Sequence, residues 1–162
     1  MADHPQTQPQ LASTGAIQNS LTRNSEGWFE YVVQVYPHHT DYGGIVWHGT
    51  YIAWMEEARV ASLRAIGIEY AELVTQGVEL PVVELALRYH RSVQMGQTLV
   101  IKTRMTASEG VRINWDYQIQ SPDAQDLYVT AQVVLVAVDR EKGKIVRQLP
   151  PGLKDALAKL VV

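Results

Sequence analysis

The sequence predicts an α+β domain in which an antiparallel β-sheet wraps around one central α-helix. The first observation is a stretch over residues 51–65 in which apolar side chains recur at three- and four-residue intervals, the spacing of one helix face. The second is a series of four later stretches, rich in β-branched and aromatic residues and separated by turn signals. Such strands form antiparallel neighbours, and the apolar helix face needs a sheet to cover it.

The composition is that of an ordinary globular protein and excludes several classes of function. The chain has 162 residues, enough for one domain, with 46% hydrophobic and 19% charged residues. A net charge of -3 offers no basic field, so no nucleic-acid partner is expected. The absence of cysteine excludes disulfides, a cysteine nucleophile and thiolate metal sites, and it fits a reducing compartment.

Neither a membrane span nor a secretory leader is expected. No apolar run approaches the roughly 18 to 20 residues that cross a bilayer, and the N-terminus lacks the features of a signal peptide. We therefore expect a cytoplasmic protein without membrane insertion. Residues 1–25 are rich in Gln, Ser, Thr, Asn and Pro, which predicts a flexible or loosely attached extension before a domain at residues 26–162. A short arm docked on a partner subunit is the alternative for this extension.

The first elements are a strand and the long helix. Residues 28–36 are aromatic and β-branched and predict a strand, which Pro37 ends because proline has no N–H for the ladder. The helix begins after a loop that runs to residue 47, and it is expected to end near Gly67. Its predicted buried face comprises Tyr51, Trp54, Met55, Ala58, Ala61, Ser62 and Ala65, whereas Glu56, Arg59 and Leu63 are expected to lie away from that face.

A short helix over residues 68–76, ended by Gly77, precedes the remaining strands. These strands are predicted at residues 80–90, 98–108, 111–121 and 127–139, and a final helix at residues 153–160 begins after two prolines. Because short turns join them, consecutive strands are expected to be antiparallel neighbours. Their free edges favour pairing between subunits, so at least a homodimer is expected.

Chemistry is expected in the loop that leads into the long helix. Asp41 is the only carboxylate in this loop, and it precedes Gly43 and Gly44, where the backbone is able to approach a ligand closely. His48 and Gly49 stand near the expected helix start, whose free N–H groups suit an oxyanion or a polarised carbonyl. A carboxylate beside such donors is able to act as general base on water or as nucleophile at an acyl carbon. The alternative is that Asp41 only forms the turn or caps the helix.

Other site chemistries find less support in the same region. A metal site is not expected, because His38 and His39 point to opposite sides of an extended segment and only His48 adds a further histidine. No G-x-S-x-G elbow supports a serine nucleophile. Glu56 and Glu57 are alternative acids, but helix carboxylates near an arginine usually form surface ion pairs.

These residues resemble a known family. The run V-Y-P-H-H-T-D-Y-G-G-I-V-W-H-G-T-Y, then M-E-E-A-R and later L-R-Y-H-R-S-V-Q-M-G-Q-T-L-V-I-K-T, is similar to hotdog-fold acyl-CoA thioesterases of the 4-hydroxybenzoyl-CoA thioesterase and YbgC type. The similarity extends over about residues 28–140. It implies a hotdog fold, hydrolysis of an acyl- or aroyl-CoA thioester, and no cofactor beyond the coenzyme A of the substrate.

The resemblance also assigns roles to individual residues. Asp41 corresponds to the family's catalytic aspartate, acting as nucleophile or as base toward the thioester. The backbone N–H of His48 would polarise the thioester carbonyl, and in the YbgC-like branch the imidazole is thought to take part as well. Gly44 belongs to the substrate-binding loop. Trp47 and Tyr51 would line the acyl pocket or support the helix, with core packing the expected role of Tyr51.

Two further expectations concern charge. The family often has an acidic residue where this chain has His39, and a protonated histidine there would favour the ionised form of Asp41. Arg91 and Arg112 are the candidates for binding the phosphates of coenzyme A, with solvated charges beside turns as the equal alternative.

The resemblance further implies an assembly and leaves several functions open. In hotdog enzymes the site lies between two subunits, which implies a homodimer or a homotetramer with phosphate contacts from the partner chain. Narrower alternatives are a 1,4-dihydroxy-2-naphthoyl-CoA hydrolase or an acyl-carrier-protein thioesterase. An alternative of another class is a hotdog protein that binds acyl-CoA without turnover.

Overall fold

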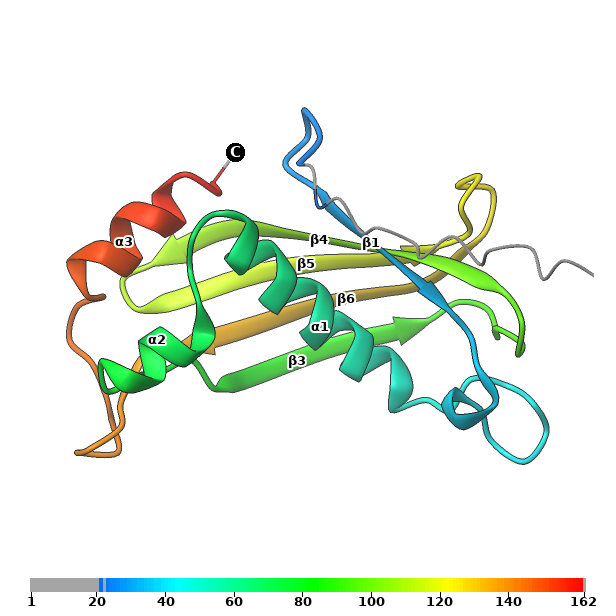
Figure 1. The fold of residues 1–162 in the computed structure, drawn as a ribbon, viewed down its shortest axis with the longest axis horizontal. Helices are drawn as coiled ribbons and strands as arrows, with labels where there is room; N and C mark the ends of the chain where they lie inside the picture. The colour runs from blue at the N-terminus through cyan, green and yellow to red at the C-terminus, as the bar shows by residue number, and fades with distance from the viewer. Residues whose placement is uncertain (1–20, 22, 162) are drawn as a thin grey trace, which may run out of the picture.

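The computed structural model describes residue 21 and residues 23–161 of the chain (Figure 1). Along the sequence the elements are β1 (Phe29–Gln34), the 3-10 helix η1 (Pro37–His39), α1 (Thr50–Ala65), α2 (Tyr70–Thr75), β2 (Val78–Glu79), β3 (Val82–Tyr89), β4 (Thr98–Glu109), β5 (Arg112–Gln120), β6 (Leu127–Val136), β7 (Val138–Asp139), β8 (Lys144–Ile145) and α3 (Pro151–Ala158).

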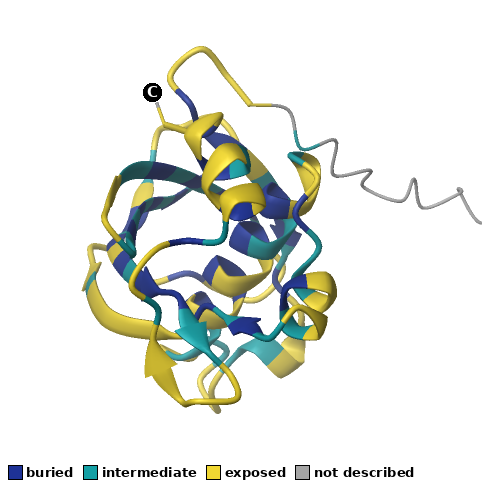
Figure 2. Ribbon diagram, turned by 90° about the vertical axis from the view of Figure 1, so that its left-hand side faces the viewer, coloured by how far each residue is buried: buried dark blue, intermediate teal, exposed yellow. Residues whose placement is uncertain are grey.

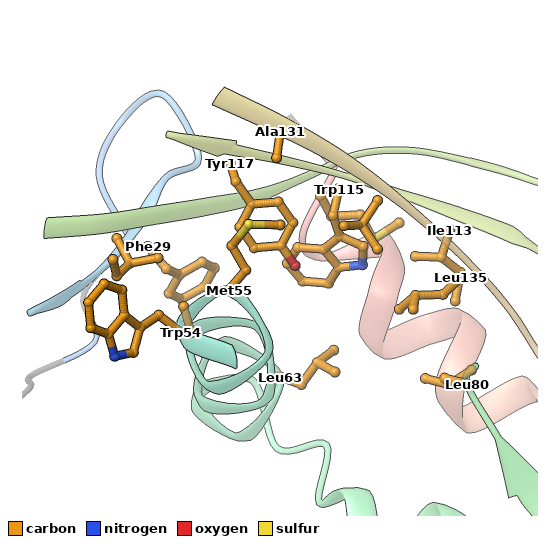
Figure 3. Close-up of a cluster of buried hydrophobic side chains, with 14 of the residues drawn as sticks. Phe29, Trp54, Met55, Leu63, Leu80, Ile113, Trp115, Tyr117, Ala131 and Leu135 are labelled. Carbon is orange, nitrogen blue, oxygen red and sulfur yellow. The ribbon is translucent and has the colours of Figure 1, made fainter. Parts of the chain in front are cut away.

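One antiparallel sheet, in the order β1-β4-β5-β6-β3, forms the body of the fold, and β2, β7 and β8 form a small second sheet. Helix α1 lies across the inner face of the large sheet (Figure 1). In Figure 3, Met55 on α1 points toward Tyr117 on β5, and both side chains are buried. The predicted class, an antiparallel sheet around a central helix, is confirmed.

Strand β5 shows how the sequence pattern builds this core. Ile113, Trp115, Tyr117 and Ile119 are each 1% exposed or less, and the residues between them are only partly buried. Because successive strand side chains point to opposite faces, the apolar set faces α1 and the polar set faces outward. The burial colouring of Figure 2 shows the same alternation of buried and less buried residues along the sheet.

The order of the strands differs from the sequence prediction at one connection. β3 pairs with β6, while β4 lies between β1 and β5, so the expectation that β3 and β4 are neighbours was wrong. Residues 91–97 do not close a hairpin. They cross the end of the sheet, where the N–H of Gly96 donates to the carbonyl of Val35 (2.9 Å) and the N–H of Met95 donates to Gly44 (3.0 Å). These backbone bonds bring β4 beside β1.

The buried face of α1 is rotated from the predicted one. Arg59 is 2% exposed and Leu63 is 1% exposed, whereas Ala65 is exposed, so the placement of Arg59 and Leu63 away from the core was wrong. The Arg59 guanidinium donates to the Tyr117 hydroxyl (3.0 Å) and pairs with Glu56, so two of its nitrogens have partners inside the fold. None of the described helices is long and apolar enough to cross a membrane.

The predicted N-terminal extension falls mainly on residues 1–20 and 22, which lie outside the described residues. Its described part is attached to the domain. The Arg23 guanidinium donates to the carbonyl of Lys159 (2.7 Å) and to that of Leu160 (2.7 Å), at the C-terminal end of α3. An arginine at this position satisfies helix carbonyls and complements the negative end of the helix dipole.

Candidate active site

The loop between η1 and α1 is built around the Asp41 side chain. Its Oδ1 accepts hydrogen bonds from the N–H groups of Gly43 (2.9 Å) and Ile45 (3.1 Å). Gly44 has a φ of 75°, a conformation that glycine adopts without strain. Asp41 is therefore a turn former, as the alternative reading expected. Its Oδ2 accepts no hydrogen bond from any residue that the structure describes, which leaves one carboxylate oxygen for chemistry.

Residues 93–96, in the crossing segment, support this loop from the side. The N–H of Val46 donates to the carbonyl of Val93 (2.9 Å), and Ile45 forms an isolated antiparallel bridge with Gln94. Together with the Met95–Gly44 bond, these contacts hold the loop against the crossing segment at the end of the sheet. The crossing segment thus connects the loop to β4.

The first residues of α1 leave several backbone N–H groups without acceptors. The N–H of Thr50 donates to the carbonyl of Trp47 (2.9 Å), and the Thr50 hydroxyl donates to the carbonyl of His39 (3.0 Å). No described acceptor meets the N–H groups of His48, Gly49 or Tyr51. These groups stand at the positive end of a 16-residue helix, so they suit a carbonyl oxygen that gains negative charge.

A cavity of about 330 Å³ lies beside this helix start. Its walls come from the loop, the first turn of α1 and the end of β3, and comprise Ile45, Val46, His48, Tyr51, Tyr89, His90, Arg91 and Ser92. Three predicted site residues, His48, Tyr51 and Arg91, therefore meet in one place. Asp41 and Trp47 belong to the adjoining loop but do not line the cavity.

Tyr89 is the site residue that sequence reasoning missed. Its hydroxyl donates to the backbone carbonyl of His48 (2.6 Å), and its ring contacts that of Tyr51 at a centroid distance of 5.5 Å. Burial raises the pKa of Tyr89 above its ordinary value, so the hydroxyl keeps its proton and acts as a donor. Strand alternation placed Tyr89 at the end of a strand, but only the tertiary fold brings that end to the helix start.

Tyr51 combines core packing with a place on the cavity wall. It is 2% exposed, and burial raises its pKa to about 12 although a backbone hydrogen bond from Val93 lowers it. Its ring also packs edge-on against Trp54 at 5.7 Å. A neutral, immobilised phenol is a supporting group rather than a base near neutral pH.

Trp47 covers the helix start and explains why residue 49 is glycine. A Cβ on Gly49 would lie 2.1 Å from Cζ3 of Trp47, a distance that no real contact allows. The indole is 53% exposed and lies 4.7 Å from the His48 ring. Trp47 therefore presents a flat apolar surface beside the free N–H groups.

His39, at a position where the resembling family often has an acidic residue, is held as a neutral ring. Its Nδ1 accepts the N–H of Tyr36 (3.0 Å), so that nitrogen carries no proton. Burial lowers the pKa of His39, and His38 lowers it further, while Glu57 opposes them. The ring also packs edge-on against Trp54 at 5.1 Å. A neutral His39 gives Asp41 no electrostatic support at neutral pH.

The two arginines proposed for phosphate binding lie far apart. Arg91 lines the cavity and pairs with Asp126, and its side chain is 65% exposed. Arg112 pairs with Glu84 and does not line this cavity. Arg112 is opposite Val136 on β6 and Tyr89 is opposite Val129, so seven positions, roughly 23 Å at ~3.3 Å per residue, separate them along the strand. Of these two arginines, only Arg91 lines the cavity.

No cluster of three His, Asp or Glu side chains able to hold a metal ion occurs among residues 21 and 23–161. One hollow, of about 420 Å³, lies beside Glu84 and Arg112, and another, of about 410 Å³, lies on the outer sheet face around Trp28, Arg104 and Asp116, away from the helix start. Its polar side chains pair with one another, as Arg104 does with Asp116 at 3.5 Å. The free N–H groups and the Asp41 loop distinguish the smaller cavity as the candidate site.

Comparison with known proteins shows the family to which the chain belongs. Residues 35–157 match the family model of the thioesterase-like superfamily. The chain is 49% identical to "Putative esterase sll0410" of Synechocystis sp., over 99% of both chains. It is 30% identical to the acyl-CoA thioester hydrolase YbgC of Escherichia coli O6:H1, over 77% of this chain and 92% of the relative.

A solved structure shows the same fold. The 1,4-dihydroxy-2-naphthoyl-CoA thioesterase Slr0204 of Synechocystis superposes with a TM-score of 0.75 and 24% identity, covering 82% of this chain and 97% of that one. The fold, with its helix against an antiparallel sheet, agrees with the family that the sequence matches. The chain belongs to the thioesterase-like superfamily and is a YbgC-like thioester hydrolase with the hotdog fold.

Proposed function

We propose that this enzyme hydrolyses acyl- or aroyl-CoA thioesters at the junction of the Asp41 loop and helix α1. The observation that carries the proposal is the set of N–H groups at His48, Gly49 and Tyr51, which have no acceptor among the described residues and open beside a cavity. They follow a loop in which one Asp41 oxygen has no partner in the same part of the chain. Donors and a carboxylate are the two groups that thioester hydrolysis needs. The names of the YbgC relatives and of the naphthoyl-CoA thioesterase support this substrate class.

The reaction divides between these two groups. The N–H of His48 donates to the thioester carbonyl oxygen and stabilises the negative charge that develops on it. Asp41 Oδ2 either takes a proton from the water that attacks the carbonyl carbon, or attacks that carbon itself and forms an anhydride that water then opens. In both routes a C–O bond replaces the C–S bond, and the coenzyme A sulfur leaves as a thiolate that takes up a proton.

Trp47 and Arg91 are suited to the two ends of such a substrate. The exposed indole of Trp47 offers a flat apolar surface for the acyl group beside the helix start. Arg91 places a guanidinium on the cavity wall, where a phosphate is able to compete for it with Asp126. The same chemistry would serve a phosphopantetheine carried by a protein, and the cytoplasmic location expected from the sequence suits either carrier.

A second copy of the chain completes the proposed enzyme. β3 is an edge of the large sheet, and its Val82, Val83, Leu85 and Tyr89 are 43–47% exposed. An unpaired edge that also exposes apolar side chains favours pairing with another strand. An antiparallel β3–β3 pair joins two five-stranded sheets into one and covers these side chains.

The decisive experiment is thiol release by the purified protein over a panel of aromatic, short-chain and long-chain acyl-CoAs. Asp41→Asn keeps the Oδ1 acceptor for Gly43 and Ile45 but removes the carboxylate. We expect kcat to fall by a factor of about 100 to 10,000, the usual contribution of a general base, with the melting temperature unchanged.

The matched control is Asp123→Asn. Asp123 also closes a turn, accepting the N–H of Gln125 (3.1 Å) and the hydroxyl of Ser121 (2.6 Å), but it lies in the β5–β6 connection. This variant is expected to keep wild-type turnover. Equal activity of Asp41→Asn and wild type would refute the role of Asp41. Tight acyl-CoA binding in calorimetry without thiol release would instead identify a binding protein.

A further inference from the structure

Tyr89 connects the edge strand of the sheet to the start of α1 through a single hydrogen bond. Its hydroxyl donates to the carbonyl of His48 at 2.6 Å, across 41 residues of sequence. The ring is 47% exposed, so apolar burial alone does not explain a tyrosine at this position. No other residue of the described chain hydrogen-bonds this hydroxyl, and the bond ends on the backbone of a proposed catalytic residue.

The backbone of Tyr89 is itself firmly held. Tyr89 is in register with Val129 of β6, and the next residue, His90, donates its N–H to the carbonyl of Tyr128 (2.8 Å). The ring of Tyr89 also packs edge-on against the buried Tyr51. The hydroxyl therefore reaches His48 from a rigid sheet and not from a loop.

Two hydrogen bonds fix the backbone on both sides of His48. The N–H of Thr50 holds the carbonyl of Trp47, in the peptide unit before the His48 Cα, and Tyr89 holds the carbonyl of His48, in the unit after it. Each peptide unit is planar, so holding both carbonyls fixes φ and ψ of His48. The directions of its N–H and of its Cα–Cβ bond are then set together.

We propose that Tyr89 is a positioning residue that aims the His48 N–H at the thioester carbonyl. This inference rests on the proposed function of the same site. The Tyr89 hydroxyl donates its proton to the protein backbone, so in this proposal it acts through His48. Its contribution is to keep the N–H in line with the carbonyl oxygen at the moment when charge develops there.

The test compares Tyr89→Phe with Tyr70→Phe. Both variants lose one hydroxyl that donates to a backbone carbonyl, since Tyr70 donates to Leu80 at 3.0 Å, away from the cavity. Misplacement of a reacting group by ~1 Å lowers rates by about a hundredfold, and a partial loss of alignment predicts a fall in kcat of about tenfold for Tyr89→Phe. KM and the melting temperature are expected to stay near wild type, and Tyr70→Phe is expected to keep wild-type kcat.

A second readout follows the backbone directly. Loss of a hydrogen bond to the His48 carbonyl changes the amide nitrogen chemical shift of Gly49, which shares that peptide unit, and this is expected in Tyr89→Phe but not in Tyr70→Phe. A wild-type kcat in Tyr89→Phe would overturn the proposal, as would an equal loss in both variants. If the wild-type enzyme released no thiol, the proposed function would fail, and the Gly49 shift would still decide whether Tyr89 holds this peptide unit.

Discussion

The two carboxylate oxygens of Asp41 differ in their surroundings. Oδ1 closes the turn through Gly43 and Ile45, and Oδ2 is unpartnered within the described chain. The turn bonds therefore fix the direction of the second oxygen, so forming the turn is compatible with the proposed catalytic role. His48 shows a similar division, because its N–H is part of the helix start and its imidazole lies on the cavity wall.

Substitution of His48 separates these two roles. His48→Ala removes the imidazole and keeps the backbone N–H, and no described residue hydrogen-bonds the imidazole. We expect thiol release to fall by less than about tenfold, well below the effect of losing a general base. The measurement is the steady-state kinetics of His48→Ala, compared with those of Asp41→Asn. A loss as large as that of Asp41→Asn would show that the imidazole itself takes part in the reaction.

At the scale of an element, the start of α1 depends on close contact between Trp47 and Gly49. The indole lies where a side chain at residue 49 would stand, and the helix N–H groups open beside it. The backbone at Gly49 has φ −77° and ψ −22°, which any residue adopts without strain. Glycine is therefore required here by the ring and not by the backbone.

Gly49→Ala is expected to displace the Trp47 ring and reduce kcat/KM by about tenfold, because a shifted wall misplaces the substrate. The control is Gly152→Ala in α3, where an added Cβ meets no atom within 4 Å and activity should be unchanged. In a Trp47→Ala background the Gly49→Ala substitution should have no additional effect on kcat/KM, since the two residues act through one contact. An additive loss would contradict this account.

At the scale of the whole molecule, the edge strand β3 serves two surfaces. Its end supplies Tyr89 to the cavity, and its free edge and exposed apolar side chains are the proposed contact with a second copy. Because the proposed site lies beside this edge, the proposed assembly and the proposed catalysis would share an element. Pairing along β3 would also cover the half-exposed ring of Tyr89 and strengthen its hydrogen bond.

A charge on β3 tests the proposed pairing. Leu85→Lys places an ammonium group on the paired edge, and such charges oppose strand pairing, so we expect a shift from dimer to monomer in light scattering together with reduced turnover. Ile145→Lys is the control, because Ile145 is a similarly exposed apolar residue (57%) on β8, outside the large sheet. A wild-type protein that is monomeric at assay concentration would refute the pairing.

The sequence alone determined the long elements and predicted a location for the site. Alternating and helical periodicities are local properties, as are the proline and glycine signals that end strands and helices. They predicted α1, α2, α3 and the long strands, and the Asp41 loop was recognisable from its residues and its resemblance to a family. Each of these depends on neighbours within a few positions, which the sequence displays directly.

Only the tertiary structure decided which distant segments meet. The crossing of residues 91–97 placed β4 beside β1. Packing of α1 against the sheet buried Arg59 with Tyr117, and strand pairing brought the Tyr89 hydroxyl to the His48 carbonyl. The same packing left Arg112 with Glu84, away from the cavity. The Arg59–Tyr117 contact joins residues 58 positions apart, and the Tyr89–His48 contact joins residues 41 positions apart. Their choice depends on closing loops and burying apolar surface over the whole chain, which no local pattern specifies.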